Sequence, residues 1–275
     1  MAVSDATVAT TIGELLRSWR RRRSLSQLEL SLNAAISSRH LSFVETGRAR
    51  PSREMVLHLA EELQVPLRER NGLLLAAGYA PAYAERPLDT PDMDSVRQAI
   101  DRFLRAHEPY PAVVVDRHHD LVAANDALTL VLEGVSPDLL EPPANALRVA
   151  LHPRGMAPRT VNLGEWSAHL LARLRREVQI TGDPELARLY DELVAYPGVE
   201  VTPPQHELRP SDIVLPLRLR DLGDGKELAF FSTLSTFGTP MDITLAELSI
   251  EAFYPANAHT AMRLLNGIDA DQPPA

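Results

Sequence analysis

Between residues 27 and 50 the chain carries side chains that can hydrogen-bond with nucleic-acid bases and phosphates. An arginine guanidinium can donate two parallel hydrogen bonds to guanine O6 and N7, and we expect Arg39 to make this contact. Serine hydroxyls can bond bases or phosphates, a phenylalanine can contact a thymine methyl group, and an amide at a helix N-terminus can hold a phosphate. The candidate DNA contacts are Gln27, Ser37, Ser38, Arg39, Ser42, Phe43, Arg48 and Arg50.

This chemistry requires a short helix that enters the major groove, and the sequence predicts one. Residues 11–14 and 26–29 have the spacing of capping boxes, which begin a first and a second helix. A third helix is expected from residue 38 to about residue 46, and Gly47 ends it. With two further helices, residues 1–80 form a five-helix unit. Its second and third helices are joined by a three-residue turn, which predicts a helix-turn-helix DNA-binding domain.

Charge and proline content divide the chain into parts. The net charge of −9 is the sum of +3 over residues 1–80, which hold 11 Arg and 8 acidic residues, and −12 over the remainder. A basic domain joined to an acidic one indicates two domains with different partners. We expect a helix-turn-helix domain over 1–80, a proline-rich linker over 81–93, a second domain over 94–268 and a disordered tail over 269–275.

The second domain is predicted to be α+β, with an antiparallel sheet and helices on one side. Asn125 is expected to cap a helix, and His118 and His119 are expected to be solvated turn residues. Strands are predicted near 110–116, 121–124, 213–219, 228–234 and 241–253, and helices near 94–107, 162–180, 183–196 and 255–265.

Several residues of this domain are candidates for lining a ligand pocket. Aromatic side chains can form its wall, although each is as well explained as plain core. His169 and Arg173 lie four residues apart on one helix face and can orient a carboxylate or carbonyl group, or simply be solvated. The candidate ligand contacts are Trp166, His169, Arg173, Phe230, Phe237 and Phe253.

Composition and motifs exclude several functions. The absence of Cys excludes disulfides, thiolate zinc sites and cysteine nucleophiles. No hydrolase, zinc-protease, phosphate-loop or dinucleotide motif occurs, so we predict no catalytic residue, no metal site, no cofactor and no enzymatic activity. No apolar run has the ~18 residues of a membrane span and the N-terminus has no apolar signal core, so we expect a cytoplasmic protein without a membrane partner.

Residues 26–30 (SQLEL) and 38–52 (SRHLSFVETGRARPS) resemble the Xre-type helix-turn-helix of phage-repressor ancestry. With 66–81 (PLRERNGLLLAAGYAP), they resemble the bacterial regulators that pair this domain with an MmyB-like, PAS-like ligand-binding domain. Segments 112–116 (AVVVD) and 237–255 (FGTPMDITLAELSIEAFYP) are similar to that second domain. One departure is Ala35, at a turn position that is often Gly. If this position needs a left-handed backbone, alanine costs on the order of 1 kcal/mol there.

The resemblance implies a pocket for a small, largely apolar or fatty-acid-like ligand. We therefore expect a ligand-controlled transcription regulator, a repressor that binds double-stranded DNA as a homodimer on a pseudo-palindromic operator. Two alternatives remain open at this stage. In the first, the second domain is a protein-interaction or dimerisation module without a ligand. In the second, it is an enzyme whose site has no recognised motif.

Overall fold

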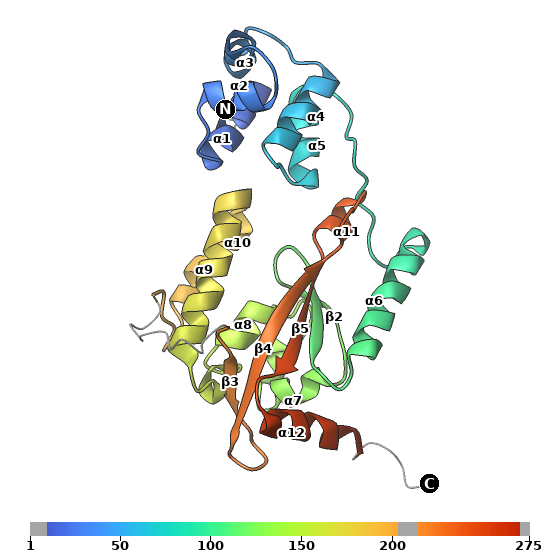
Figure 1. Cartoon of the computed structure of the whole chain (residues 1–275), viewed down its shortest axis with the longest axis vertical. Helices are drawn as coiled ribbons and strands as arrows, with labels where there is room; N and C mark the ends of the chain where they lie inside the picture. Colours follow the sequence, from blue (N-terminus) through green and yellow to red (C-terminus); the bar gives the residue numbers. More distant parts are fainter. Residues whose placement is uncertain (1–9, 203–213, 270–275) are drawn as a thin grey trace, which may run out of the picture. The chain divides into compact units, whose positions relative to one another are not determined.

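The computed structural model describes residues 10–202 and 214–269, which form two compact units. The first consists mainly of the residues up to Glu85 and the second of the residues from Arg86 onward. This division falls inside the segment 81–93, for which the sequence predicts a linker. The predicted strand over 213–219 and tail over 269–275 lie partly outside the described residues. Figure 1 shows the helices of the first unit and the sheet of the second.

The first unit is all-α, as predicted, and local side-chain caps fix where its helices begin. Thr11 and Ser26 accept hydrogen bonds from the backbone N–H three residues later and complete the two predicted capping boxes. Ser37 and Ser52 cap the third and fourth helices in the same way. The helices are α1 (Ile12–Arg22), α2 (Gln27–Asn33), α3 (Ser38–Glu45), α4 (Arg53–Glu62) and α5 (Leu67–Ala76).

The second unit contains a five-stranded antiparallel sheet with the order β2-β1-β5-β4-β3 (Figure 1). The two predicted hairpins form, and the central strand β5 joins them. This arrangement agrees with the predicted α+β, PAS-like class. The strands are β1 (Ala112–Val115), β2 (Leu121–Ala124), β3 (Leu217–Arg220), β4 (Glu227–Thr236) and β5 (Ser249–Pro255).

Both faces of this sheet are covered, and the prediction of helices on one side is wrong. Side chains alternate between the faces of a strand, and all four side chains of β1 are buried. Val113 and Val115 belong to the main core with α7 (Leu128–Leu132), α8 (Ala146–Leu151), α9 (Leu163–Thr181) and α10 (Pro184–Val194). Ala112 and Val114 pack on the other face against α6 (Asp94–His107), a helix that the sequence predicted with these bounds.

The end of the chain differs in detail from the prediction. Residues 241–253 do not form one strand, because the short helix α11 (Ile243–Ala246) precedes β5. Asn125 does not cap α7. Its side chain instead bonds the backbone of Leu104, Tyr110 and Ala112, and so it fixes the β1–β2 hairpin. The helix α12 (Ala258–Asp269) and the 3-10 turns η1 (Pro91–Met93), η2 (Pro137–Leu139) and η3 (Ala157–Arg159) complete the described elements.

Candidate nucleic-acid interface and ligand cavity

The helix α3 is held by its buried side on α1 and α2. Leu41 and Val44 are fully buried, and the hydroxyls of Ser31 and Ser38 are 2.9 Å apart between the two helices of the motif. Small residues at this contact allow the helices to approach closely. In the turn between them Ala35 has φ 50°, which is the left-handed backbone conformation in which alanine is strained. The opposite, exposed side of α3 is therefore presented in a fixed orientation.

A buried ion pair connects α3 to α1. Arg20 donates from Nε and Nη2 to the two carboxylate oxygens of Glu45, at 2.6 and 2.9 Å. Burial alone would raise the pKa of Glu45, but the hydrogen bonds from Arg20 and Gln27 outweigh it and lower that pKa. Glu45 is thus an internal pairing residue, and its carboxylate is held ionised where α3 ends.

The exposed side of α3 carries an arginine and an aromatic ring. The guanidinium of Arg39 lies 5.3 Å from the ring centroid of Phe43, and that of Arg48 lies 6.0 Å from it. These are cation–π distances, and they hold both charges beside the ring. Arg39 is exposed, and among the described residues it makes no hydrogen bond. Its donors are therefore available for a base edge or a phosphate.

Other predicted DNA contacts have partners inside the domain. The Gln27 amide donates to Glu45 at 2.8 Å, and Arg50 donates to the carbonyl of Ala77 at 2.9 Å. Ser37 accepts from the backbone N–H of His40 as the cap of α3, and Ser42 is half-buried. Gln27, Ser37 and Arg50 thus have hydrogen-bond partners within the helical unit, and the role of all four side chains as DNA contacts stays a prediction.

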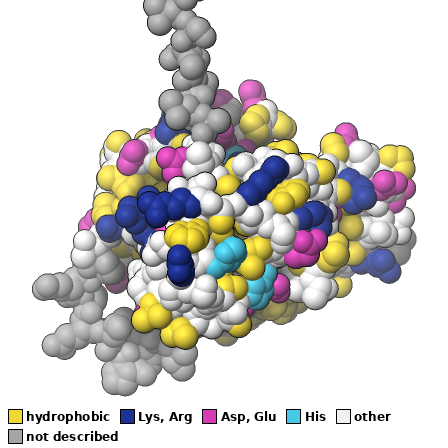
Figure 2. Space-filling model, turned by 90° about the horizontal axis from the view of Figure 1, so that it is seen from above, with side chains coloured by type: hydrophobic (Ala, Val, Ile, Leu, Met, Phe, Trp, Pro, Cys, Tyr) yellow, Lys and Arg dark blue, Asp and Glu magenta, His cyan; other side chains and the backbone are white. Residues whose placement is uncertain are grey.

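The run of four arginines at 20–23 also has mixed roles. Arg20 is buried, and Arg23 donates to the carbonyl of Leu63 at 2.9 Å. Arg21 and Arg22 are exposed beside Arg17 along a shallow hollow on α1. Figure 2, which views the molecule from above, shows Lys and Arg side chains spread over the face in view, among apolar and histidine side chains. Such a surface can hold the phosphates that flank a reading helix.

In the second unit, a cavity of about 70 Å³ lies between the sheet and α7, α8 and α9. It is large by comparison with the roughly 10–15 Å³ that a single water needs. All lining side chains are apolar except that of Glu251. The wall consists of Val113, Leu121, Leu128, Val131, Leu132, Ala146, Leu147, Val149, Ala150, Met156, Trp166, Leu170, Leu217, Glu251 and Phe253.

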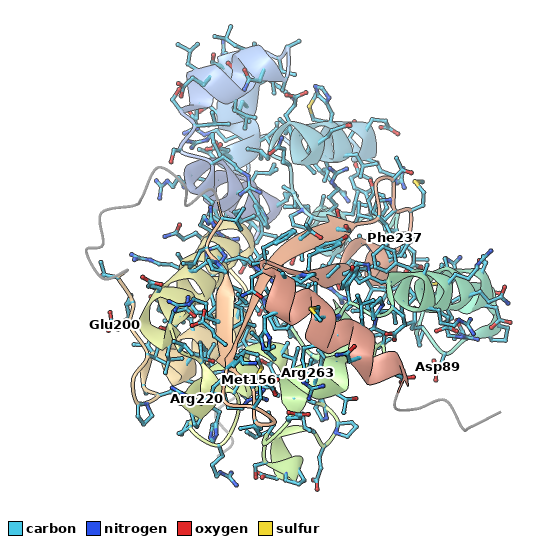
Figure 3. All side chains as sticks on the ribbon, turned by 60° about the horizontal axis from the view of Figure 1, so that its bottom comes forward. Asp89, Met156, Glu200, Arg220, Phe237 and Arg263 are labelled. Atoms are coloured by element: carbon cyan, nitrogen blue, oxygen red, sulfur yellow. The ribbon has the colours of Figure 1, made fainter. Side chains whose placement is uncertain are left out.

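Of the four aromatic residues predicted to line the pocket, two lie in this wall and two do not. Trp166 and Phe253 line the cavity. Phe230 is fully buried in the surrounding core and does not line it. Phe237 packs with the cluster on the opposite face of the sheet, and Figure 3 shows it well apart from Met156 of the cavity wall. Phe230 and Phe237 are therefore not lining residues: Phe230 packs within the core beside the cavity, and Phe237 packs on the opposite face of the sheet.

The two polar candidates lie next to the cavity. The imidazole of His169 is stacked on Trp166, with ring centroids 5.7 Å apart. Arg173 lies 3.5 Å from Glu251 and 3.5 Å from Glu177, so that its guanidinium is shared between two carboxylates. Glu251 itself was missed, because a glutamate in a predicted strand gives no sign of facing an apolar space.

The turn between β1 and β2 extends this polar network, and its histidines are not both solvated as predicted. His119 is only 5% exposed, and its Nε2 lies 2.7 Å from Glu177 on α9. Burial alone would raise the pKa of Glu177, but His119 and Arg173 outweigh it and lower that pKa. His118 contacts Asp183, the cap of α10. The turn therefore packs on the helices.

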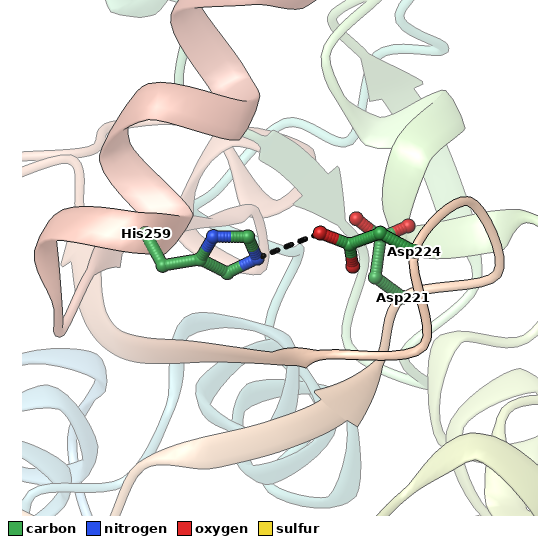
Figure 4. Close-up of side chains that lie close together, drawn as sticks. All are labelled: Asp221, Asp224 and His259. Carbon is green, nitrogen blue, oxygen red and sulfur yellow. Dashed lines mark ion pairs between the residues drawn. The ribbon is translucent and has the colours of Figure 1, made fainter.

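A second polar cluster lies at the β3–β4 turn. Asp221, Asp224 and His259 have ligand atoms within 4.8 Å of one another, the spacing of a metal site (Figure 4). Arg263 lies 3.0 Å from Asp221, however, and Lys226 lies 3.0 Å from Asp224. Two cations thus already neutralise the two carboxylates, and the cluster is an ion-pair group that holds α12 to the turn.

An all-α unit with a capped reading helix, together with a PAS-like sheet around an apolar cavity, defines a DNA-binding transcription regulator with a ligand-binding domain. Residues 11–73 match the family described as helix-turn-helix domain. Residues 96–265, more than half of the chain, match the family described as MmyB-like transcription regulator ligand binding domain. The chain belongs to these MmyB-like regulators.

Both matched families are regulatory rather than enzymatic. No curated protein matches the chain. In the part of the chain that the structure describes, none of the helices combines the length and apolar character needed to span a bilayer.

Proposed function

We propose that this protein is a transcription repressor that binds a pseudo-palindromic operator as a homodimer and responds to a small, largely apolar ligand. The cavity carries the proposal. The fold of a domain without a ligand gains no stability from an apolar, partly open cavity of this kind, since each unfilled space forfeits packing energy.

The DNA-binding half of the proposal is supported by the exposed side of α3. Arg39 has the donor geometry to distinguish guanine from other bases, and Phe43 offers an apolar surface for a thymine methyl group. Arg48 is exposed just beyond the end of the same helix and offers a charge for a flanking phosphate, whereas the hydroxyl of Ser38 is already in contact with that of Ser31.

Dimerisation and repression follow from general arguments about such domains. One short reading helix contacts few base pairs, so two copies on half-sites about one DNA turn apart give the required specificity. A protein bound to an operator blocks other proteins from the same DNA by steric overlap alone. Repression of transcription therefore needs fewer additional contacts than activation. A ligand changes this occupancy only if it has different affinities for the DNA-bound and free states.

The DNA assignment is tested by mobility shift on a site enriched by the full-length protein from random-sequence DNA. Arg39→Ala is expected to lose discrimination at one base pair by about 1–3 kcal/mol, which is roughly 5- to 150-fold. Arg105→Ala, which removes an exposed arginine of α6, is the matched control and should bind like the unaltered protein. Unchanged affinity and sequence preference in Arg39→Ala would overturn the assignment of α3.

The ligand assignment is tested by mass spectrometry of material released when the purified protein is denatured. We expect a small apolar molecule in amounts comparable with the protein. Ala146→Leu, which fills part of the cavity wall, should release much less. Equal recovery from both proteins would place the molecule elsewhere.

A further inference from the structure

The one charged residue of the cavity wall lies at the centre of the sheet. Glu251 is on β5, the middle strand, opposite Val113 of β1 and Leu234 of β4. Its neighbours Ile250 and Ala252 face α6 on the other side of the sheet. Alternation along the strand therefore directs Glu251, together with Phe253, toward the cavity.

A carboxylate in an apolar wall is costly unless a partner compensates it. The side chain of Glu251 is 13% exposed, and its Oε2 lies 3.5 Å from Nη1 of Arg173 on α9. This distance is that of a loose ion pair rather than of a short bidentate one. The carboxylate consequently keeps acceptor capacity toward the cavity.

The cations near Glu251 are already engaged. Arg173 also faces Glu177, at 3.5 Å, and Glu177 bonds His119. Burial lowers the pKa of His169, and the neighbouring Arg173 lowers it further, so this imidazole is neutral near neutral pH. A ligand carboxylate entering the cavity would meet Glu251 and would compete with two protein carboxylates for one guanidinium.

We propose that Glu251 is a specificity-determining residue that selects ligands with an apolar body and a hydrogen-bond-donating end, an alcohol or an amine, over the corresponding carboxylic acids, and that this chain thereby departs from the fatty-acid-like ligand that the family resemblance implies. This inference rests on the ligand-binding role proposed above. Donation to Glu251 compensates its burial, whereas a ligand carboxylate places a like charge beside it. The preference for one headgroup over another thus follows from the carboxylate of Glu251, which lies in the cavity wall and faces Arg173 of α9.

The test compares octanol, octylamine and octanoate, with their hexyl counterparts, by their effect on the fluorescence of Trp166 at pH 7, in full-length protein in which Trp19→Phe leaves Trp166 as the single tryptophan. Trp166 lines the cavity and reports occupancy. We expect the alcohol and the amine to bind at least tenfold more tightly than the acid. Glu251→Gln should cut the advantage of the amine over the acid by about tenfold or more, because it removes the like charge and releases Arg173 from one carboxylate.

Two variants control this experiment. Glu227→Gln alters a glutamate that is paired with Arg218 on the same sheet but lies outside the cavity wall, and it should keep the order of affinities. Ala146→Leu should weaken the binding of all the probes, because the larger side chain fills part of the cavity. If octanoate binds as tightly as the alcohol and the amine, or if Glu251→Gln leaves the order unchanged, the headgroup proposal is wrong while the ligand site stands. If no probe of either length binds, the ligand-binding role fails with it.

Discussion

Both domains contain a network of arginine and glutamate, buried in the helical domain and half-buried in the sheet domain, and the two networks differ in how tightly they are closed. In the helical domain, Arg20 and Glu45 meet through two hydrogen bonds of 2.6 and 2.9 Å, and Gln27 adds a third. In the sheet domain, Arg173 is divided between Glu177 and Glu251, at 3.5 Å from each.

The difference corresponds to what each domain has to do. A closed bidentate pair fixes α3 in one orientation, which a reading helix needs because base contacts depend on geometry of a few tenths of an ångström. A shared guanidinium next to a cavity can be redistributed when a ligand enters. The first network specifies a shape, and the second can respond to an occupant.

The largest expected effect breaks the closed network. Glu45→Ala should destabilise the helical domain by about 3–5 kcal/mol, because it leaves the buried charge of Arg20 without its partner. The chain has two tryptophans, Trp19 in the helical domain and Trp166 in the sheet domain, so urea unfolding of single-tryptophan variants follows each domain separately.

Only the Trp19 transition should move in Glu45→Ala. Glu61→Ala, which alters an exposed glutamate of α4, serves as the control and should change stability by less than about 0.5 kcal/mol. A loss below about 1 kcal/mol in Glu45→Ala would mean that the pair does not hold α3.

The second effect sharpens the comparison with acid. In Glu45 and Glu177 the folded state lowers the pKa below the usual 4.5, so the stability they contribute is present above pH 4.5 and is lost as the pH falls through the folded pKa. The sheet domain has further hydrogen-bonded carboxylates whose pKa is lowered, such as half-buried Asp183 and Glu192, so its stability should fall more steeply.

Urea midpoints measured from pH 7 to pH 3 with the two tryptophan reporters give the change of stability with pH for each domain. A midpoint reported by Trp166 that does not change with pH would contradict the assignment. Glu177→Gln should flatten the slope of the sheet domain and leave that of the helical domain as it was.

The smallest effect concerns backbone strain in the turn of the helical domain. Ala35 has φ 50°, where alanine is strained and glycine is not, so Ala35→Gly should stabilise this domain by about 1 kcal/mol. Ala34→Gly is the matched control and should destabilise it, because Ala34 has φ −80° and is buried. Thermal unfolding of both variants measures the opposite signs.

Features encoded within a few neighbouring residues could be predicted from the sequence. The caps at Thr11 and Ser26 depend on backbone groups three residues away, and the strained turn at Ala35 follows from the helix-turn-helix spacing. The α6 helix and the β1–β2 hairpin were likewise found from periodicity and β-branched residues.

Features that depend on distant contacts could not be predicted. Gly13 allows α1 to approach α3, since a Cβ there would lie 2.6 Å from the carbonyl oxygen of Glu45, but in the sequence it is only a poor helix former. Glu177 and His119 are 58 positions apart. The six-residue helix α8 is too short to show a period, although it forms part of the cavity wall.

The length of α9 has a mechanical consequence. This 19-residue helix carries Trp166 at the cavity near its first turn and continues well beyond Arg173 and Glu177. At a rise of 1.5 Å per residue, a rotation of about 5° around Trp166 displaces the far end of the helix by about 2 Å. A rotation of this size would therefore move Thr181 far enough for the side chains around it to repack. A small change at the cavity end of α9 is thus amplified along the length of the helix toward Thr181.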